Sequence, residues 1–232
     1  MPPPLQPANI DGALPARRAK RAFGAMLISL TACLSCFPEA IQASSDQREV
    51  SLELLLALDV SKSIDAAEFR LQKQGISHAF RQPKVIQAIL GGDKNGVAVG
   101  LMQWSSFPQW TRSALWMEID DRKDAETFAG KVDDITRTNK RGSTAIGRAV
   151  NRGVREIRNN RFDGSRKIID VIGDGRSNVG IEPSEARDAA VSKSITINAL
   201  AILTEDPELD RYFLEELVGG AEHDFGVAVV VD

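Results

Sequence analysis

The sequence has little cysteine: Cys33 and Cys36 are the two in the chain, and both lie in an apolar stretch near the N-terminus. Their C-x-x-C spacing is that of a redox pair, but inside such a stretch we interpret it as coincidence. If the chain is cleaved after this stretch, the remaining protein has no cysteine. Disulfides and thiol chemistry are then excluded, and its stability must come from a hydrophobic core.

The sequence also has little histidine and no strong net charge. His78 and His223 are far apart in the sequence and neither lies near a nucleophile motif. The P-loop pattern G-x-x-x-x-G-K-[ST] and the nucleophile elbow G-x-S-x-G are both absent. The net charge is -3 with mixed signs, which gives no reason to propose nucleic acid as a partner.

The N-terminal region has the pattern of an export signal. A basic cluster at residues 17–21 precedes an apolar run at residues 22–37, which is shorter than the roughly 20 residues that span a membrane. Small residues follow, so we predict a signal peptide at residues 1–43, cleaved after Ala43. The mature protein is then periplasmic or secreted.

Two alternatives stay open for this region. Leu30-Thr31-Ala32-Cys33 resembles the lipobox of bacterial lipoproteins, in which the cysteine is lipidated and anchors the protein to a membrane. Against this, the sequence stays apolar after Cys33 as far as Phe37. The other alternative is a buried N-terminal helix of a cytosolic protein.

The rest of the chain alternates between apolar strand patterns and helical patterns. After a short linker at residues 44–49, we predict one domain at residues 50–232. Strands are predicted at residues 50–59, 96–106, 111–119, 167–174, 195–203 and 225–231. Helices are predicted at residues 65–81, 123–135, 144–159, 182–193 and 207–218. Asp65 and Glu68 form a capping-box pattern at the first helix, and Pro83 with the Gly91-Gly92 pair is interpreted as a loop.

This alternation predicts an α/β fold with a doubly wound, mostly parallel six-stranded sheet. Helices are expected on both faces of the sheet. The strand at residues 111–119 is expected to be an antiparallel edge strand.

Oxygen-bearing side chains follow the ends of two predicted strands. Asp59 ends the first strand, and Ser61 and Ser63 follow at every second position, so an extended loop would point all three the same way. Asp174 ends a later strand, and Thr144 opens a helix. Ligands of such sheets bind beyond the carboxyl ends of the strands. Each residue alone is an ordinary cap or turn residue. Together they form a set of hard oxygen donors, which predicts a site for Mg²⁺, Mn²⁺ or Ca²⁺.

Asp59-x-Ser61-x-Ser63, Thr144 and Asp174 resemble, in order and placement, the metal-ion-dependent adhesion site (MIDAS) of the von Willebrand factor type A (vWA) domain. The resemblance extends from about residue 50 to residue 232, and is closer to exported bacterial proteins of this type whose function is uncharacterised. It implies that the two serines and the threonine contact the metal directly, and that the aspartates act directly or through water. An open coordination position would accept an Asp or Glu carboxylate of a partner protein. The implied function is adhesion, not catalysis.

One departure from the family pattern concerns the end of the domain. Family members end in a helix after the last strand, whereas this sequence stops at Asp232. The expectation is that the terminal helix is missing or the sequence truncated, which leaves regulation by a shift of that helix open.

Three basic residues, Lys62, Arg141 and Arg176, neighbour the predicted ligands. They either attract an acidic partner or are solvated loop charges. Two alternative functions also stay open. One is a structural vWA domain without metal. The other is a Mg²⁺-dependent hydrolase of the dehalogenase-like type, but that class needs D-x-D, and here the second position is Ser61.

Overall fold

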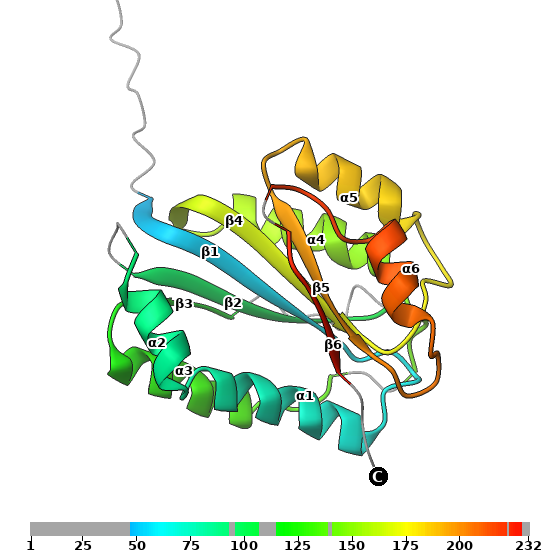
Figure 1. The fold of residues 1–232 in the computed structure, drawn as a ribbon, viewed down its shortest axis with the longest axis horizontal. Coiled ribbons are helices and arrows are strands. Elements are labelled where there is room, and N and C mark those ends of the chain that lie inside the picture. The colour runs from blue at the N-terminus through cyan, green and yellow to red at the C-terminus, as the bar shows by residue number, and fades with distance from the viewer. Residues whose placement is uncertain (1–46, 93–95, 107–114, 139–140, 222, 229–232) are drawn as a thin grey trace, which may run out of the picture. The chain divides into compact units, whose positions relative to one another are not determined.

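The apolar run at residues 54–58 forms part of the long strand at the middle of the sheet (Figure 1). The structure is a computed structural model and describes residues 47–92, 96–106, 115–138, 141–221 and 223–228, all within the unit Ser44–Asp232. Its strands are β1 (Arg48–Asp59), β2 (Val97–Trp104), β3 (Leu115–Ile119), β4 (Phe162–Gly173), β5 (Thr196–Ile202) and β6 (Phe225–Ala228). Their order across the sheet is β3-β2-β1-β4-β5-β6.

Strand pairing confirms the predicted fold class. β1 lies between β2 and β4 and is parallel to both, and β5 and β6 continue the sheet in parallel. β3 pairs with β2 in the antiparallel direction at the edge. Because parallel neighbours end at the same edge of the sheet, the residues that follow β1 and β4 are brought close together.

Helices cover both faces of the sheet, as predicted (Figure 1). They are α1 (Ala66–Ala79), α2 (Pro83–Leu90), α3 (Arg122–Asp133), α4 (Ile146–Arg158), α5 (Pro183–Val191) and α6 (Leu209–Glu216). Alternate residues of β1 point to opposite faces. Leu55 and Ala57 pack in the core cluster that includes α4, α5 and α6. Leu56 and Leu58 pack in the cluster that includes α2 and α3, with α1 against it.

The interpretation of residue 83 and the residues after it as a loop was wrong, because they form α2. Pro83 occupies the first turn of this helix, where a missing backbone N–H costs nothing. Ile86 and Ile89 are the buried residues of this short helix and hold it against the core. Gly91 follows as the C-terminal cap. The proline that was taken as the mark of a loop is therefore a helix start.

Several element boundaries differ from the predictions by a few residues. β1 begins at Arg48, before Val50, and β4 begins at Phe162, well before Lys167, because Phe162 pairs with Arg48 across the two strands. Parts of two predicted strands, residues 111–114 and 229–231, lie outside the described residues, as do the predicted signal peptide and the chain end.

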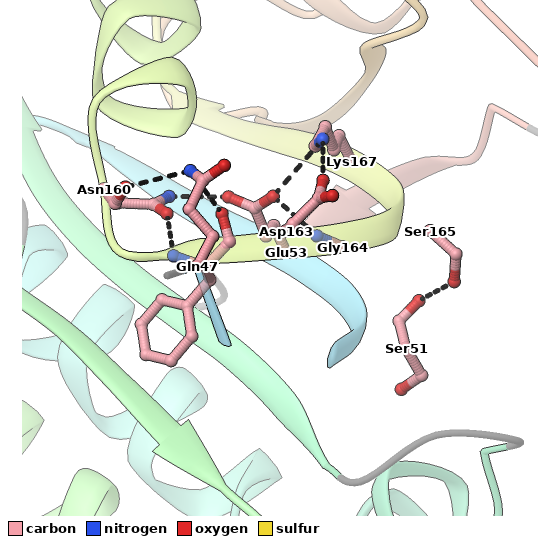
Figure 2. A network of polar contacts seen from close by, with 9 residues as sticks. Gln47, Ser51, Glu53, Asn160, Asp163, Gly164, Ser165 and Lys167 are labelled. Carbon is pink, nitrogen blue, oxygen red and sulfur yellow. Dashed lines mark hydrogen bonds and ion pairs between the residues drawn. The ribbon is translucent and has the colours of Figure 1, made fainter. Parts of the chain in front are cut away.

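Glu53 is a fully buried carboxylate in the first half of β1 (Figure 2). The Nδ2 of Asn160 donates a hydrogen bond to it at 2.5 Å, and the backbone N–H of Gly164 donates another at 2.9 Å. Lys167 lies 3.6 Å away and completes an ion pair. A Cβ on Gly164 would lie 2.7 Å from the backbone nitrogen of Glu53, so this close approach requires glycine. The network fastens β1 to the beginning of β4.

An apolar groove of about 690 Å³ runs over β4, β5 and β6 on the side that carries α1. Leu54 and Leu56 of β1, Ile76 of α1 and Leu200 of β5 are among the residues that line it. The helices of the described residues thus leave part of this face of the sheet uncovered. None of the helices in the described part of the chain is long and apolar enough to cross a membrane.

Candidate metal centre

The strand register brings the two predicted aspartates to one edge of the sheet. Leu58 of β1 pairs with Ile172 of β4, so Asp59 and Asp174 both follow closely after this pair. Both side chains are buried, with exposed fractions of 0% for Asp59 and 1% for Asp174. Two acidic side chains therefore occupy the same buried end of the sheet.

A chain of close contacts runs from Asp59 to Asp174 through the two serines. The backbone N–H of Ser61 donates to Oδ1 of Asp59 at 2.6 Å. The Oγ atoms of Ser61 and Ser63 lie 3.1 Å apart, and Oγ of Ser63 donates to Oδ1 of Asp174 at 2.9 Å. The structure thus brings four of the five predicted ligands into direct contact, and the alternate spacing does turn Ser61 and Ser63 to the same side.

The other oxygen of each aspartate has no such contact. Oδ2 of Asp59 and Oδ2 of Asp174 are buried and have no hydrogen-bond partner among the described residues. Burying an unpaired charge is costly, and most buried polar atoms in proteins have a partner. With the hydroxyls of Ser61 and Ser63, these two carboxylates form a set of hard oxygen donors that fits Mg²⁺, Mn²⁺ or Ca²⁺.

The acidities of both aspartates reflect this environment. Burial raises the pKa of Asp59 to about 8, and the nearby negative charge of Asp174 contributes to the rise. Burial also raises the pKa of Asp174, against the opposing effect of its hydrogen bond from Ser63. A bound cation would favour the charged forms, because an opposite charge nearby stabilises a carboxylate.

Thr144 joins the group through its loop. It is buried just before α4, where its backbone N–H donates to Oδ1 of Asn178 at 3.0 Å and its carbonyl oxygen accepts from the Asn178 N–H at 2.9 Å. In the same loop, the carbonyl oxygen of Gly142 accepts a hydrogen bond from the N–H of Lys62 at 2.8 Å. This bond fastens the Thr144 loop to the Asp59–Ser63 loop.

Asn178 and Arg137 are two residues beside this site that the sequence did not reveal. Asn178 holds Thr144, and Arg137 donates from Nη2 to the carbonyl oxygens of Val60 and Ser61. Neither belongs to a recognisable motif, and both come from loops that are distant from their contacts in the sequence. Their part in the site follows from how the loops meet.

The three predicted partner-binding residues differ in their surroundings. Lys62 and Arg141 are exposed, on the two loops that the Lys62–Gly142 hydrogen bond joins. Arg176 is exposed too, but it forms an ion pair with Asp206 at 2.7 Å and its guanidinium lies over the ring of Tyr212. Arg176 is therefore held by its own chain.

A separate acidic group lies at the beginning of α3, where Asp120, Asp121 and Asp124 approach one another. Asp121 accepts the backbone N–H of Asp124 at 2.7 Å and is the N-terminal cap of the helix. Acidic side chains at a helix N-terminus also interact favourably with its dipole. Helix capping accounts for this group.

A protein-family model described as "Protein of unknown function (DUF1194)" matches residues 49–229. The chain belongs to the DUF1194 family. The resemblance to the vWA domain inferred from the sequence is confirmed for the fold by the solved structures described next. A comparison with curated protein sequences found no match.

Solved structures similar to this chain include vWA domains. The open form of the pilus adhesin SpaC from Lactobacillus rhamnosus GG is 15% identical with a TM-score of 0.56, over 78% of this chain and 28% of that one. The VWA domain of SpRpn10 is 14% identical with a TM-score of 0.53, over 78% and 88%. Proximal thread matrix protein 1 from the mussel byssus, described with a zinc-occupied MIDAS motif, is 20% identical with a TM-score of 0.50. That match covers 67% of this chain but 39% of the mussel protein. At these identities the likeness establishes the fold of this DUF1194 member.

Proposed function

We propose that this DUF1194 protein binds a partner protein through a divalent cation held by Asp59, Ser61, Ser63, Thr144 and Asp174. The two serines and the threonine would supply neutral oxygens, and the aspartates would supply the negative charge. With few anionic ligands, the cation would keep much of its charge. It would then attract an Asp or Glu carboxylate of the partner to an open coordination position.

The observation that carries this proposal is a pair of buried carboxylate oxygens, Oδ2 of Asp59 and Oδ2 of Asp174. Neither has a hydrogen-bond partner in the part of the chain that the structure describes. A purely structural role would favour their pairing with donors of the protein, as happens for the buried carboxylate of Glu53. A divalent cation, bound directly or through water, would offset the charge of both carboxylates.

The charges around the candidate site suit an acidic partner. Lys62 and Arg141 are exposed on adjacent loops and are proposed as partner contacts. Arg176 was predicted as a third, and its ion pair with Asp206 would have to open before it could contact a partner.

The test of the cation site is thermal unfolding of the purified protein with EDTA and with Mg²⁺, Mn²⁺, Ca²⁺ or Zn²⁺. Zn²⁺ is included because the similar mussel protein is described with zinc in its MIDAS. A cation that binds the folded state raises the midpoint of unfolding. At a free cation concentration one hundred times the dissociation constant, it adds about 2.7 kcal/mol to the free energy of unfolding. We expect this rise in the wild type and in Asp124→Asn, which alters the other acidic group. We expect none in Asp59→Ala.

No rise with any of these cations, from a folded sample, would contradict the proposal and favour a structural vWA domain without metal. A rise that disappears in Asp124→Asn but persists in Asp59→Ala would place the cation at the acidic group of α3, which would also contradict the proposal. Turnover of p-nitrophenyl phosphate that depends on Asp59 would favour the hydrolase alternative.

Partner binding is tested after the cation. A binding partner should be retained by the wild type in the presence of the effective cation, and released by EDTA. Asp59→Ala should fail to retain it, and the double variant Lys62→Ala/Arg141→Ala should retain it more weakly without any loss of cation affinity. A partner that binds equally in EDTA would contradict the proposed mode of binding.

We also propose that the protein is exported, with residues 1–43 as a signal peptide. The N-terminus of the protein isolated from its native cells tests this directly. Cleavage after Ala43 leaves Ser44 as the first residue, and lipidation would leave Cys33 first, attached to a membrane. An intact Met1 in the native host would contradict export by either route.

A further inference from the structure

Arg137 lies in the segment between α3 and α4 and reaches the back of the Asp59–Ser63 loop. Its Nη2 donates to the carbonyl oxygen of Ser61 at 2.5 Å and to that of Val60 at 3.3 Å. Hydrogen bonds from a charged donor are stronger than those between neutral groups. The guanidinium therefore contacts the backbone of the loop that carries two of the proposed ligands.

Arg137 is itself held in place by Gln103 of β2. The Nε2 of Gln103 donates to the carbonyl oxygen of Thr136 at 2.8 Å, and its Oε1 accepts the backbone N–H of Thr138 at 2.9 Å. The Gln103 side chain thus forms hydrogen bonds with the residues immediately before and after Arg137. The segment cannot slide along the sheet without losing both bonds, so the backbone on either side of Arg137 is held in place.

Both peptide units around Ser61 are held at their two ends. In the Val60–Ser61 unit, the carbonyl contacts Arg137 and the N–H donates to Oδ1 of Asp59. In the Ser61–Lys62 unit, the carbonyl contacts Arg137 and the N–H donates to the carbonyl of Gly142. Fixing both peptide planes fixes the direction in which the Ser61 side chain leaves the backbone.

The arrangement leaves one hydrogen-bond donor of Arg137 without a partner among the described residues. This donor is the Nε, which is buried. A charged group held in this way beside a cluster of proposed ligands points to a role in that cluster.

We propose that Arg137 is a positioning residue of the candidate cation site. It holds the carbonyls of Val60 and Ser61 so that Ser61 and Ser63 present their hydroxyls to the cation. This inference rests on the proposed function, because it assigns Arg137 to the same site. The proposal predicts that loss of Arg137 weakens cation binding, whereas simple electrostatics predicts that it strengthens cation binding.

Electrostatics and positioning can be separated by one substitution. A positive charge near the site repels a divalent cation, so its removal should tighten binding if charge were the main effect. Arg137→Gln removes the charge and the paired contacts together. Weaker cation binding in this variant therefore reports the loss of loop position.

The experiment measures Mg²⁺ affinity by isothermal titration calorimetry on purified protein stripped with EDTA and dialysed. We expect Arg137→Gln to bind Mg²⁺ about tenfold more weakly, the lower end of the range for groups that orient metal ligands. Arg137→Lys can donate to a carbonyl but lacks the planar fork, so its affinity should be intermediate. Arg81→Gln is the matched control, since Arg81 pairs with Glu126 and Asp133 away from the site, and should leave the affinity unchanged.

Amide hydrogen exchange over residues 59–64 gives a second readout that needs no cation. We expect faster exchange in this loop in Arg137→Gln than in the wild type, and no change in Arg81→Gln. Mg²⁺ affinity in Arg137→Gln that equals or exceeds that of the wild type would overturn the proposal. If Arg137→Gln does not fold, Arg137→Lys takes its place, and wild-type affinity in that variant would overturn the proposal.

If the wild type binds no divalent cation, the proposed function fails separately from this inference. The exchange measurement then decides on Arg137 alone. Unchanged exchange over the loop would overturn its positioning role, and faster exchange would leave it as a residue that orders a loop without metal.

Discussion

One oxygen of Asp59 accepts a backbone hydrogen bond, and the other is buried without a partner among the described residues. Burial therefore favours the protonated form, and the pKa of Asp59 rises from 3.8 to about 8. A carboxyl whose pKa is raised on folding contributes stability that is fully present below the unfolded pKa. That contribution is lost as the pH rises through the folded pKa.

This gives a prediction for the metal-free protein. Between pH 3.8 and about 8, the stabilising contribution of Asp59 should decline as the pH rises. In Asp59→Asn the side chain cannot ionise, so the decline should be smaller. Thermal unfolding in EDTA across this range compares the two proteins. A wild type and variant with parallel pH profiles would contradict the assignment of a raised pKa to Asp59.

A bound cation should reverse the trend in the wild type. The cation binds the ionised carboxylate, so the stabilisation by Mg²⁺ should grow as the pH rises toward 8. Binding at lower pH should release a proton, and calorimetry in buffers of different ionisation enthalpy measures that release.

At the scale of elements, α1 begins directly after the proposed ligand loop. Asp65 accepts the N–H groups of Ala67 at 2.6 Å and Glu68 at 2.8 Å, and the Glu68 carboxylate accepts the N–H of Asp65 at 2.8 Å. The capping box predicted from the sequence is confirmed. It fixes the point at which the loop from Asp59 turns into the helix.

Removal of this cap should lower the free energy of unfolding only modestly. We expect Asp65→Ala to reduce the free energy of unfolding by about 1 kcal/mol, as is typical for the loss of an N-terminal cap. Asp65→Asn keeps a side-chain acceptor and should lose much less. Urea unfolding measures both. Equal losses in the two variants would mean that the charge of Asp65, and not its capping contacts, supports α1.

At the scale of the whole molecule, β1 carries two buried carboxylates that differ in their surroundings. Asp59, at the C-terminal end of the strand, retains an oxygen that no described residue pairs with. Glu53, in contrast, has donors from Asn160 and Gly164 and an ion pair with Lys167 (Figure 2). In sheets of this kind ligands bind at the C-terminal edge of the strands. We therefore assign Glu53 to stability and Asp59 to binding.

The assignment predicts separable effects of substitution. Glu53→Ala leaves the donors of Asn160 and Gly164 buried and unpaired, so it should lower the free energy of unfolding by about 3 kcal/mol. The rise in midpoint with Mg²⁺ should persist. Asp163→Ala is the control, because Asp163 is an exposed partner of Lys167 and should cost less than about 1 kcal/mol. Loss of the Mg²⁺ response in Glu53→Ala would contradict the separation of the two roles.

Local patterns account for the elements that the sequence predicted well. The apolar run before Asp59 and the Asp65–Glu68 pair each act within a few residues, and both yielded the correct element. α2 was missed because Pro83 has two local meanings, a turn residue or a helix start. The burial of Ile86 and Ile89 against the core decided between them.

Local patterns also predicted some residues of the candidate site and missed others. Asp59, Ser61, Ser63, Thr144 and Asp174 could be predicted, because each follows a strand end or precedes a helix in a recognisable order. Asn178 and Arg137 could not, because their contacts join loops that no local pattern relates.

The sequence by itself determined the α/β class, the order of strands and helices apart from α2, and the candidate set of cation ligands. These follow from hydrophobic periodicity and from residue types at the ends of elements, which depend on short stretches of chain. The tertiary structure alone decided which buried oxygens have no partner within the described ranges, which residues hold the loops, and that Arg176 is paired with Asp206. Burial and pairing are properties of segments that meet in space, and no single stretch of sequence contains both partners.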